Sequence, residues 1–89
     1  MSVRMRIIGT SEGPTAFDGQ YVMEYDPSRP GVDPEGREMV AHIVTTPDPE
    51  KARIFETLEE ALALWKQSHG IREDGRPNRP LTAFTVTFE

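Results

Sequence analysis

Hydrophobic and polar residues alternate in several stretches of the chain, and this alternation predicts β-strands because successive strand residues point to opposite faces. The first stretch, residues 3–8, ends at Gly9. The second stretch, residues 20–25, has two distinct faces, with Tyr21, Met23 and Tyr25 on one face and Val22 and Glu24 on the other. Each stretch is therefore expected to bury one face in a core.

Two further strands are expected later in the chain. Residues 38–45 are rich in β-branched side chains and are apolar on both faces, which places this strand at the centre of the sheet or under a helix. Residues 81–88 place Phe84, Val86 and Phe88 on one face. Three prolines and two glycines in residues 26–36 predict an exposed loop without any regular element.

A helix is predicted from Leu58 to about Ser68, and it carries the sole tryptophan of the chain. Leu58, Ala61, Leu62 and Trp65 recur at three- and four-residue steps, so they share one face of the helix. This face is expected to cover the sheet, through residues of the final strand.

The ends of this helix have recognisable capping residues. Thr57 and Glu60 have the spacing of a capping box, in which the glutamate carboxylate returns to the Thr57 amide. Gly70 is placed where a left-handed residue ends a helix, with Ile71 beyond it expected to contact the turn near Trp65.

A second, shorter helix is predicted in residues 48–54. Asp48 is suited to the N-cap position and Pro49 to the first helical position. Only one or two turns are expected, with Ala52 facing inward. The element order is then β-β-β-short α-α-β, and it predicts one α+β domain of residues 1–89. Its four-stranded, mostly antiparallel sheet is covered on one face by the main helix, and the last strand lies beside the first.

Composition restricts the classes of function. The 89 residues contain no cysteine, fifteen acidic residues and ten basic residues, for a net charge of −5. This charge argues against general nucleic-acid binding, which requires a concentrated positive surface. No secretory signal and no apolar run of about 20 residues is present, so the chain is expected to be a cytoplasmic protein without a membrane segment.

Motifs for catalysis, cofactors and metals are absent from the sequence, so no catalytic, cofactor-binding or metal-binding residue is predicted. His42 and His69 lack partners at metal-ligand spacing, and no serine lies in a Gly-x-Ser-x-Gly context. No glycine-rich phosphate-binding motif occurs. The loop that begins at Asp26 resembles a calcium loop, but Pro30 and Arg37 occupy ligand positions.

The candidate contact site is a basic loop in residues 72–79, comprising Arg72, Arg76, Asn78 and Arg79. Its arginines are concentrated within eight residues and stiffened by prolines, which suits an anion or a protein partner. Arg4 and Arg6 are candidates to join this loop in a larger basic surface. In the structural alternative, the loop arginines pair with Glu73, Asp74 and neighbouring acids.

The closing segment, Asp74-Gly75-Arg76-Pro77-Asn78-Arg79-Pro80-Leu81-Thr82-Ala83-Phe84, resembles the ending of small uncharacterised proteins encoded by tailed phages and prophages. The resemblance covers residues 45–89, with Glu73 where those proteins have a proline. It implies a phage or prophage context in a bacterial cytoplasm, and it implies no catalytic residue.

Three functions follow as hypotheses. The leading one is a non-enzymatic binding protein that acts through protein–protein contact, with a host factor as partner. The first alternative is a nucleic-acid-binding accessory protein that uses the basic loop, and the second is a small enzyme or ligand-binding protein without a recognisable motif. Unpaired sheet edges also make a homodimer an expected form.

Overall fold

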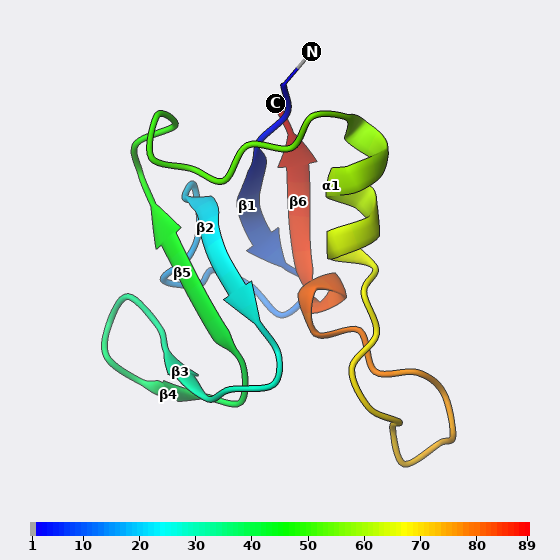
Figure 1. Ribbon diagram of the computed structural model, residues 1–89. Helices are drawn as coiled ribbons and strands as arrows, with labels where there is room; N and C mark the ends of the chain where they lie inside the picture. Colours follow the sequence, from blue (N-terminus) through cyan, green and yellow to red (C-terminus); the bar gives the residue numbers. More distant parts are fainter. Residues whose placement is uncertain (1) are drawn as a thin grey trace.

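A four-stranded antiparallel sheet forms the centre of the fold in the computed structural model, which describes residues 2–89 (Figure 1). The strand order is β5-β2-β1-β6. The bounds of these strands are β1 Met5–Thr10, β2 Tyr21–Asp26, β5 His42–Thr46 and β6 Phe84–Phe88. One α-helix, α1 (Leu58–Trp65), lies beside β6. The predicted α+β class is confirmed, and β6 pairs with β1 as expected, in the antiparallel direction.

Bulges in β1 and β2 change which residues face the core. One lies between Ile7 and Gly9, so β1 continues through the glycine that was expected to end it. The other lies between Val22 and Glu24. A bulge adds one residue to one strand, which reverses the alternation beyond it. Val22 is fully buried and Tyr25 also packs against the core, so their predicted placement on opposite faces is wrong.

The region expected to be an irregular loop followed by one central strand is different in the structure. It contains a small hairpin, β3 (Gly31–Val32) and β4 (Glu38–Met39), and β5 begins only at His42. β5 pairs with β2 alone, so it is an edge strand of the main sheet, at the opposite edge from β6 and α1. Its expected place, at the centre of the sheet or under the helix, is wrong. Gly31 permits this arrangement, because a Cβ atom there would lie 2.7 Å from the His42 Cα.

The main helix begins as predicted and ends earlier than predicted. Thr57 accepts a hydrogen bond from the Glu60 amide at 3.1 Å, while the Glu60 carboxylate accepts from the Glu56 amide and not from the Thr57 amide. The last helical residue is Trp65, with Lys66 as its cap. Gly70 has the expected left-handed φ of 75°, but it belongs to the following hairpin and does not cap the helix.

Helix α1 packs on the sheet through a narrower stripe than its sequence predicts. Ala61 is fully buried, and Leu64 and Trp65 contact the core. The Trp65 Nε1 atom donates a hydrogen bond to the Phe84 carbonyl oxygen at 3.3 Å, which fastens the end of α1 to the start of β6. Leu58 was expected on the packed face, but it is 48% exposed. Ile71, expected near Trp65, is 72% exposed.

Two other predicted elements are shorter or absent. Residues 48–52 form successive turns instead of a helix, closed by Lys51 N to Asp48 O and Ala52 N to Pro49 O. Ala52 is buried as expected. The chain then extends because the Arg53 amide donates to the Val22 carbonyl oxygen. The final strand was expected from residue 81, but a 3-10 helix, η1 (Pro80–Ala83), precedes β6 because Pro80 favours a helical start.

The core lies between the sheet, α1 and η1. Its most deeply buried side chains are Met5, Ile7, Val22 and Leu81. Phe17 is buried beside Phe84 in an edge-to-face arrangement, with ring centroids 5.4 Å apart. The start of β6 is therefore held by the contact with the Phe17 ring and by the Trp65 hydrogen bond. The helix η1 directly precedes this point in the chain.

Candidate functional site: the arginine groove

A hairpin of residues 69–79, the arginine hairpin, connects α1 to η1 and extends away from the sheet (Figure 1). Its base is closed by His69 N to Asn78 O at 2.7 Å and Asn78 N to Gly70 O at 3.0 Å. At its tip, Arg72 N donates to Arg76 O at 2.8 Å. Gly75 has a φ of 83° and donates its amide to Arg72 O, so the tip is a tight turn with a glycine bulge.

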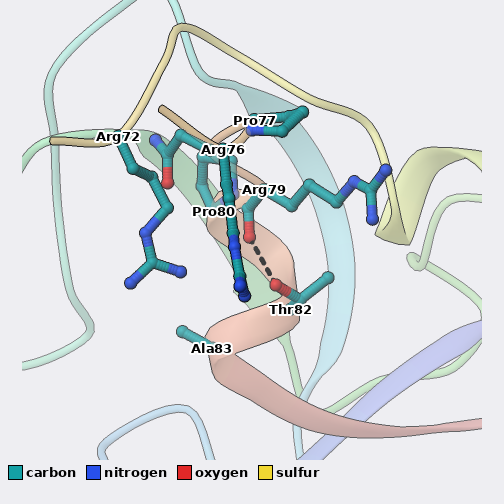
Figure 2. A pocket seen from close by; sticks show the side chains of 8 residues that line it. Arg72, Arg76, Pro77, Arg79, Pro80, Thr82 and Ala83 are labelled. Carbon is teal, nitrogen blue, oxygen red and sulfur yellow. Dashed lines mark hydrogen bonds between the residues drawn. The ribbon is translucent and has the colours of Figure 1, made fainter. Parts of the chain in front are cut away.

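The arginine hairpin and η1 enclose a groove of about 620 Å³, the arginine groove (Figure 2). Its lining residues are Arg72, Arg76, Pro77, Asn78, Arg79, Pro80, Thr82 and Ala83. Thr82 fixes the start of η1, because its amide and its hydroxyl both donate to the Arg79 carbonyl oxygen. All four residues named from the sequence as the candidate contact site thus line one groove.

Arg72 and Arg76 lie opposite each other across the arginine hairpin. Side chains at directly opposite positions of a hairpin project from the same face. Figure 2 shows both arginine side chains running in the same direction, toward Thr82 and Ala83, while the Arg79 side chain extends to the other side. Two guanidinium groups therefore share one part of the groove, and both arginines are exposed.

The expected ion pairs of the three groove arginines do not form. Within residues 2–89, carboxylate oxygens lie within 4.0 Å of Arg6, Arg29, Arg37 and His42 only. Glu73 and Asp74 are adjacent in sequence to Arg72 but not paired with it. The Asp74 Oδ1 atom instead accepts the Arg76 backbone amide at 3.0 Å, which stabilises the turn. Within residues 2–89, the three groove arginines therefore present guanidinium groups that are not ion-paired.

A second hairpin in the same chain provides a direct comparison. In residues 33–37, Asp33 N donates to Arg37 O and Gly36 N donates to Asp33 O, both at 2.9 Å, and Gly36 has a φ of 87°. The turn has the same hydrogen bonds as the arginine hairpin, yet its opposing residues carry opposite charges. Arg37 also pairs with Glu35. This turn therefore does not require two like charges at its opposing positions. The sequence contains a signal that the two turns are alike, because both five-residue segments have glycine at the fourth position and arginine at the fifth. The segments are Asp33-Pro-Glu-Gly-Arg37 and Arg72-Glu-Asp-Gly-Arg76.

Arg4 and Arg6, the two arginines considered as an extension of the basic loop, have partners elsewhere. The Arg4 Nε atom donates to the Pro49 carbonyl oxygen at 2.6 Å. Arg6 pairs with Glu89 at 3.6 Å and lies over the Tyr21 ring. Neither arginine lines the arginine groove. The positive surface expected to combine these residues is thus divided between β1 and the arginine hairpin.

Another polar hollow, of about 420 Å³, lies where β2 meets the start of β5, and sequence reasoning did not identify it. His42 Nε2 lies 3.3 Å from Glu24 Oε2, and Arg29 pairs with Asp26 at 3.5 Å. Hydrogen bonds from the Ser28 hydroxyl and amide hold the pKa of Asp26 below its usual value, with a smaller contribution from the Arg29 charge. Asp26 and Arg29 thus form an ion pair at this hollow.

Tyr25 borders this hollow. Its hydroxyl is buried and has no hydrogen-bond partner among residues 2–89. Burial raises the pKa of Tyr25, and the nearby Asp26 charge raises it further. Within the same described residues, no group of three or more histidine or acidic side chains is arranged to hold a metal ion. The arginine groove therefore remains the stronger candidate site.

Comparisons of the chain with protein-family models, with curated proteins and with solved structures find no match. The resemblance to phage and prophage proteins stays a prediction. In the described part of the chain, no helix combines the length and the apolar character needed to cross a bilayer. The functional argument therefore depends on the groove and its charges.

Proposed function

We propose that this chain is a small non-enzymatic binding protein of phage or prophage type, which acts in the bacterial cytoplasm through contact with a host protein. The contact surface is the arginine groove. The observation that carries the proposal is that Arg72, Arg76 and Arg79 line one groove and have no carboxylate oxygen within 4.0 Å among residues 2–89. An acidic segment of a partner protein supplies the missing negative charge.

The physical properties of the groove suit a protein interface. Arginine is enriched among the residues that dominate binding energy, because its planar guanidinium forms several directed hydrogen bonds and packs on flat surfaces. Pro77 and Pro80 limit the flexibility of the groove wall, so less conformational entropy is lost on binding. The half-buried Asn78 adds an amide that can donate to a partner and accept from it.

The groove also coincides with the segment that resembles phage and prophage proteins. That segment, residues 74–84, contains seven of the eight lining residues, all except Arg72. The resemblance and the concave surface therefore concern the same part of the molecule. This coincidence supports a shared contact function for the segment beyond its place in the fold.

Affinity capture from bacterial lysate tests the proposal. The wild-type chain is compared with a variant that carries Arg72→Gln, Arg76→Gln and Arg79→Gln. A matched control carries Arg29→Gln, Arg37→Gln and Arg53→Gln, which removes three exposed arginines outside the groove. The proposal predicts a protein that the wild type and the control retain and that the groove variant loses. Retention of the same proteins by all three baits, or no specific protein with any bait, contradicts it.

Nucleic-acid binding is the second candidate function, and the unpaired guanidinium groups favour it as well. Phosphate contacts of this kind weaken steeply with salt, because binding releases counter-ions. Gel-shift measurements with single-stranded and double-stranded oligonucleotides at rising salt separate the candidates. A salt-dependent complex that the groove variant loses supports the nucleic-acid function, and no complex at low salt excludes it.

A further inference from the structure

We infer that the arginine groove recognises a phosphoryl group on its protein partner, at the point where Arg72 and Arg76 project from one face of the hairpin. This inference rests on the proposed function and specifies the chemistry of the ligand. The proposed function requires only an acidic segment. The geometry at the hairpin tip points to a ligand that concentrates two negative charges in one place.

The first argument concerns the two guanidinium groups. Opposite positions of a hairpin hold Cβ atoms about 4.5–5.5 Å apart, and like charges at such positions are destabilising. A single carboxylate carries one negative charge and compensates only half of this pair. A phosphomonoester carries a charge of about −1.5 to −2 near neutral pH and three acceptor oxygens, so it can receive hydrogen bonds from both guanidinium groups.

The second argument comes from the hairpin of residues 33–37, which has the same turn. There the opposing residues are Asp33 and Arg37, and Arg37 pairs with Glu35 inside the turn. The chain thus contains one copy of the turn whose arginine is ion-paired and one copy whose two arginines have no carboxylate oxygen within 4.0 Å among residues 2–89. An external dianion would pair with Arg72 and Arg76, as the Glu35 carboxylate pairs with Arg37.

The third argument selects a protein-bound phosphoryl group over a nucleic acid. Glu73 and Asp74 lie at the tip of the hairpin, beside the two arginines, and the chain has a net charge of −5. A polyanion that continues past the groove would meet these acidic groups. A single phosphorylated side chain places its charge only at the arginines. Asn78, two residues from Arg76 and on the same hairpin face, can donate an amide hydrogen to the peptide that carries the group.

A titration followed by nuclear magnetic resonance tests the inference. The signals of the arginine Nε–Hε groups are recorded while inorganic phosphate is added at pH 7.5, and acetate is added at equal ionic strength as the comparison. The expected result is saturable movement of the Arg72 and Arg76 signals with phosphate and none with acetate. Equal responses to both anions overturn the inference.

Peptides extend the test to the ligand class. A phosphoserine peptide library with random flanks should bind the wild type, and its unphosphorylated counterpart should bind at least about tenfold more weakly. Arg76→Gln should weaken the binding of the phosphopeptides by a similar factor, while Arg37→Gln should leave their binding unchanged. Binding should also weaken at pH 5.5, because the second phosphate pKa is about 6. An oligonucleotide that binds more tightly than the phosphopeptides overturns the inference in favour of nucleic acid.

Phosphatase treatment separates this inference from the proposed function. A partner captured through the groove is treated with phosphatase and returned to the wild-type chain. Loss of binding supports the inference. Binding that survives treatment overturns the phosphoryl inference and leaves the proposed protein contact in place.

Discussion

Arg72 and Arg76 face each other across the arginine hairpin, joined by a hydrogen bond of 2.8 Å from the Arg72 amide to the Arg76 carbonyl oxygen. Their backbones therefore attract while their side-chain charges repel. Arg76→Glu would convert this repulsion into a cross-strand attraction, which typically contributes about 0.2–1 kcal/mol. The variant should raise the free energy of unfolding by about 0.5 kcal/mol in low-salt urea denaturation.

The matched control for this variant is Arg37→Glu in the hairpin of residues 33–37. There the substitution removes the ion pair with Glu35 and places two acidic residues at the opposing positions 33 and 37, so the free energy of unfolding should fall by a similar amount. If Arg76→Glu is also destabilising by this amount, the two arginines do not repel in the folded protein.

Trp65 is expected to determine how firmly α1 is held on the sheet. Trp65→Phe removes the hydrogen bond from Nε1 to the Phe84 carbonyl oxygen and leaves a smaller ring in its place. The lost hydrogen bond accounts for about 0.5–1.5 kcal/mol, and the reduced packing adds to this loss. Urea denaturation followed by circular dichroism measures the change, since the variant lacks the tryptophan fluorophore. An unchanged midpoint would show that α1 is held by Ala61 and Leu64 alone.

Tyr25→Phe should not destabilise the protein, although it alters a group that packs against the core. The Tyr25 hydroxyl is buried without a hydrogen-bond partner among residues 2–89, and such a group costs about 1–3 kcal/mol. Its removal is expected to leave the free energy of unfolding equal or higher at pH 7. Tyr21→Phe is the comparison, because the Tyr21 hydroxyl donates to Glu89 at 3.5 Å. A clear loss of stability in Tyr25→Phe would reveal a partner for this hydroxyl.

The same tyrosine predicts a stability change in alkaline solution. Burial and then the Asp26 charge raise the pKa of Tyr25 above its unfolded value of 10.0, so the unfolded chain loses this proton first as the pH rises. The resulting stability is complete below pH 10 and decreases above it. Tyr25→Phe should therefore lose less stability than the wild type between pH 9 and pH 11 in urea denaturation. Parallel pH profiles would contradict this assignment.

Asp26 predicts a change at acid pH with the opposite sign. The Ser28 hydroxyl and amide lower the pKa of Asp26 in the folded protein from 3.8, so its stabilising contribution is present above that pH and is lost as the pH falls through the lowered pKa. Ser28→Ala should raise the pKa of this carboxyl in a titration followed by nuclear magnetic resonance. Ser11→Ala is the control and should leave it unchanged.

The sequence predicted which helices and strands occur better than it predicted the residues at which they begin, bulge and end. The alternation of Phe84, Val86 and Phe88 and the N-cap residue Thr57 are local patterns, and both were confirmed, although the Glu60 carboxylate accepts from the Glu56 amide and not from the predicted Thr57 amide. The two bulges were not predictable, because the register that creates them depends on pairing between distant strands. The end of α1 was also missed, because residues 69 and 78 close a hairpin whose two halves are distant in sequence.

The residues of the candidate site were predictable, but their arrangement was not. Arginines concentrated within eight residues drew attention to Arg72, Arg76 and Arg79. Whether they would pair with Glu73 and Asp74 depends on the turn, which directs the Asp74 carboxylate to the Arg76 backbone amide. The polar hollow where β2 meets the start of β5 was not predicted for a similar reason, because a bulge places Tyr25 on the core face.

The most direct test of the arginine groove as the contact surface is site-specific photo-crosslinking. A photo-reactive amino acid at Ala83, which is exposed and lines the groove, is compared with one at Thr85, which is exposed on β6 outside the groove. In bacterial lysate, the Ala83 position should give a discrete crosslinked protein, and adding Arg76→Glu should abolish it. Equal crosslinking from Thr85, or an Ala83 product that persists with Arg76→Glu, would contradict a contact made through the arginine groove.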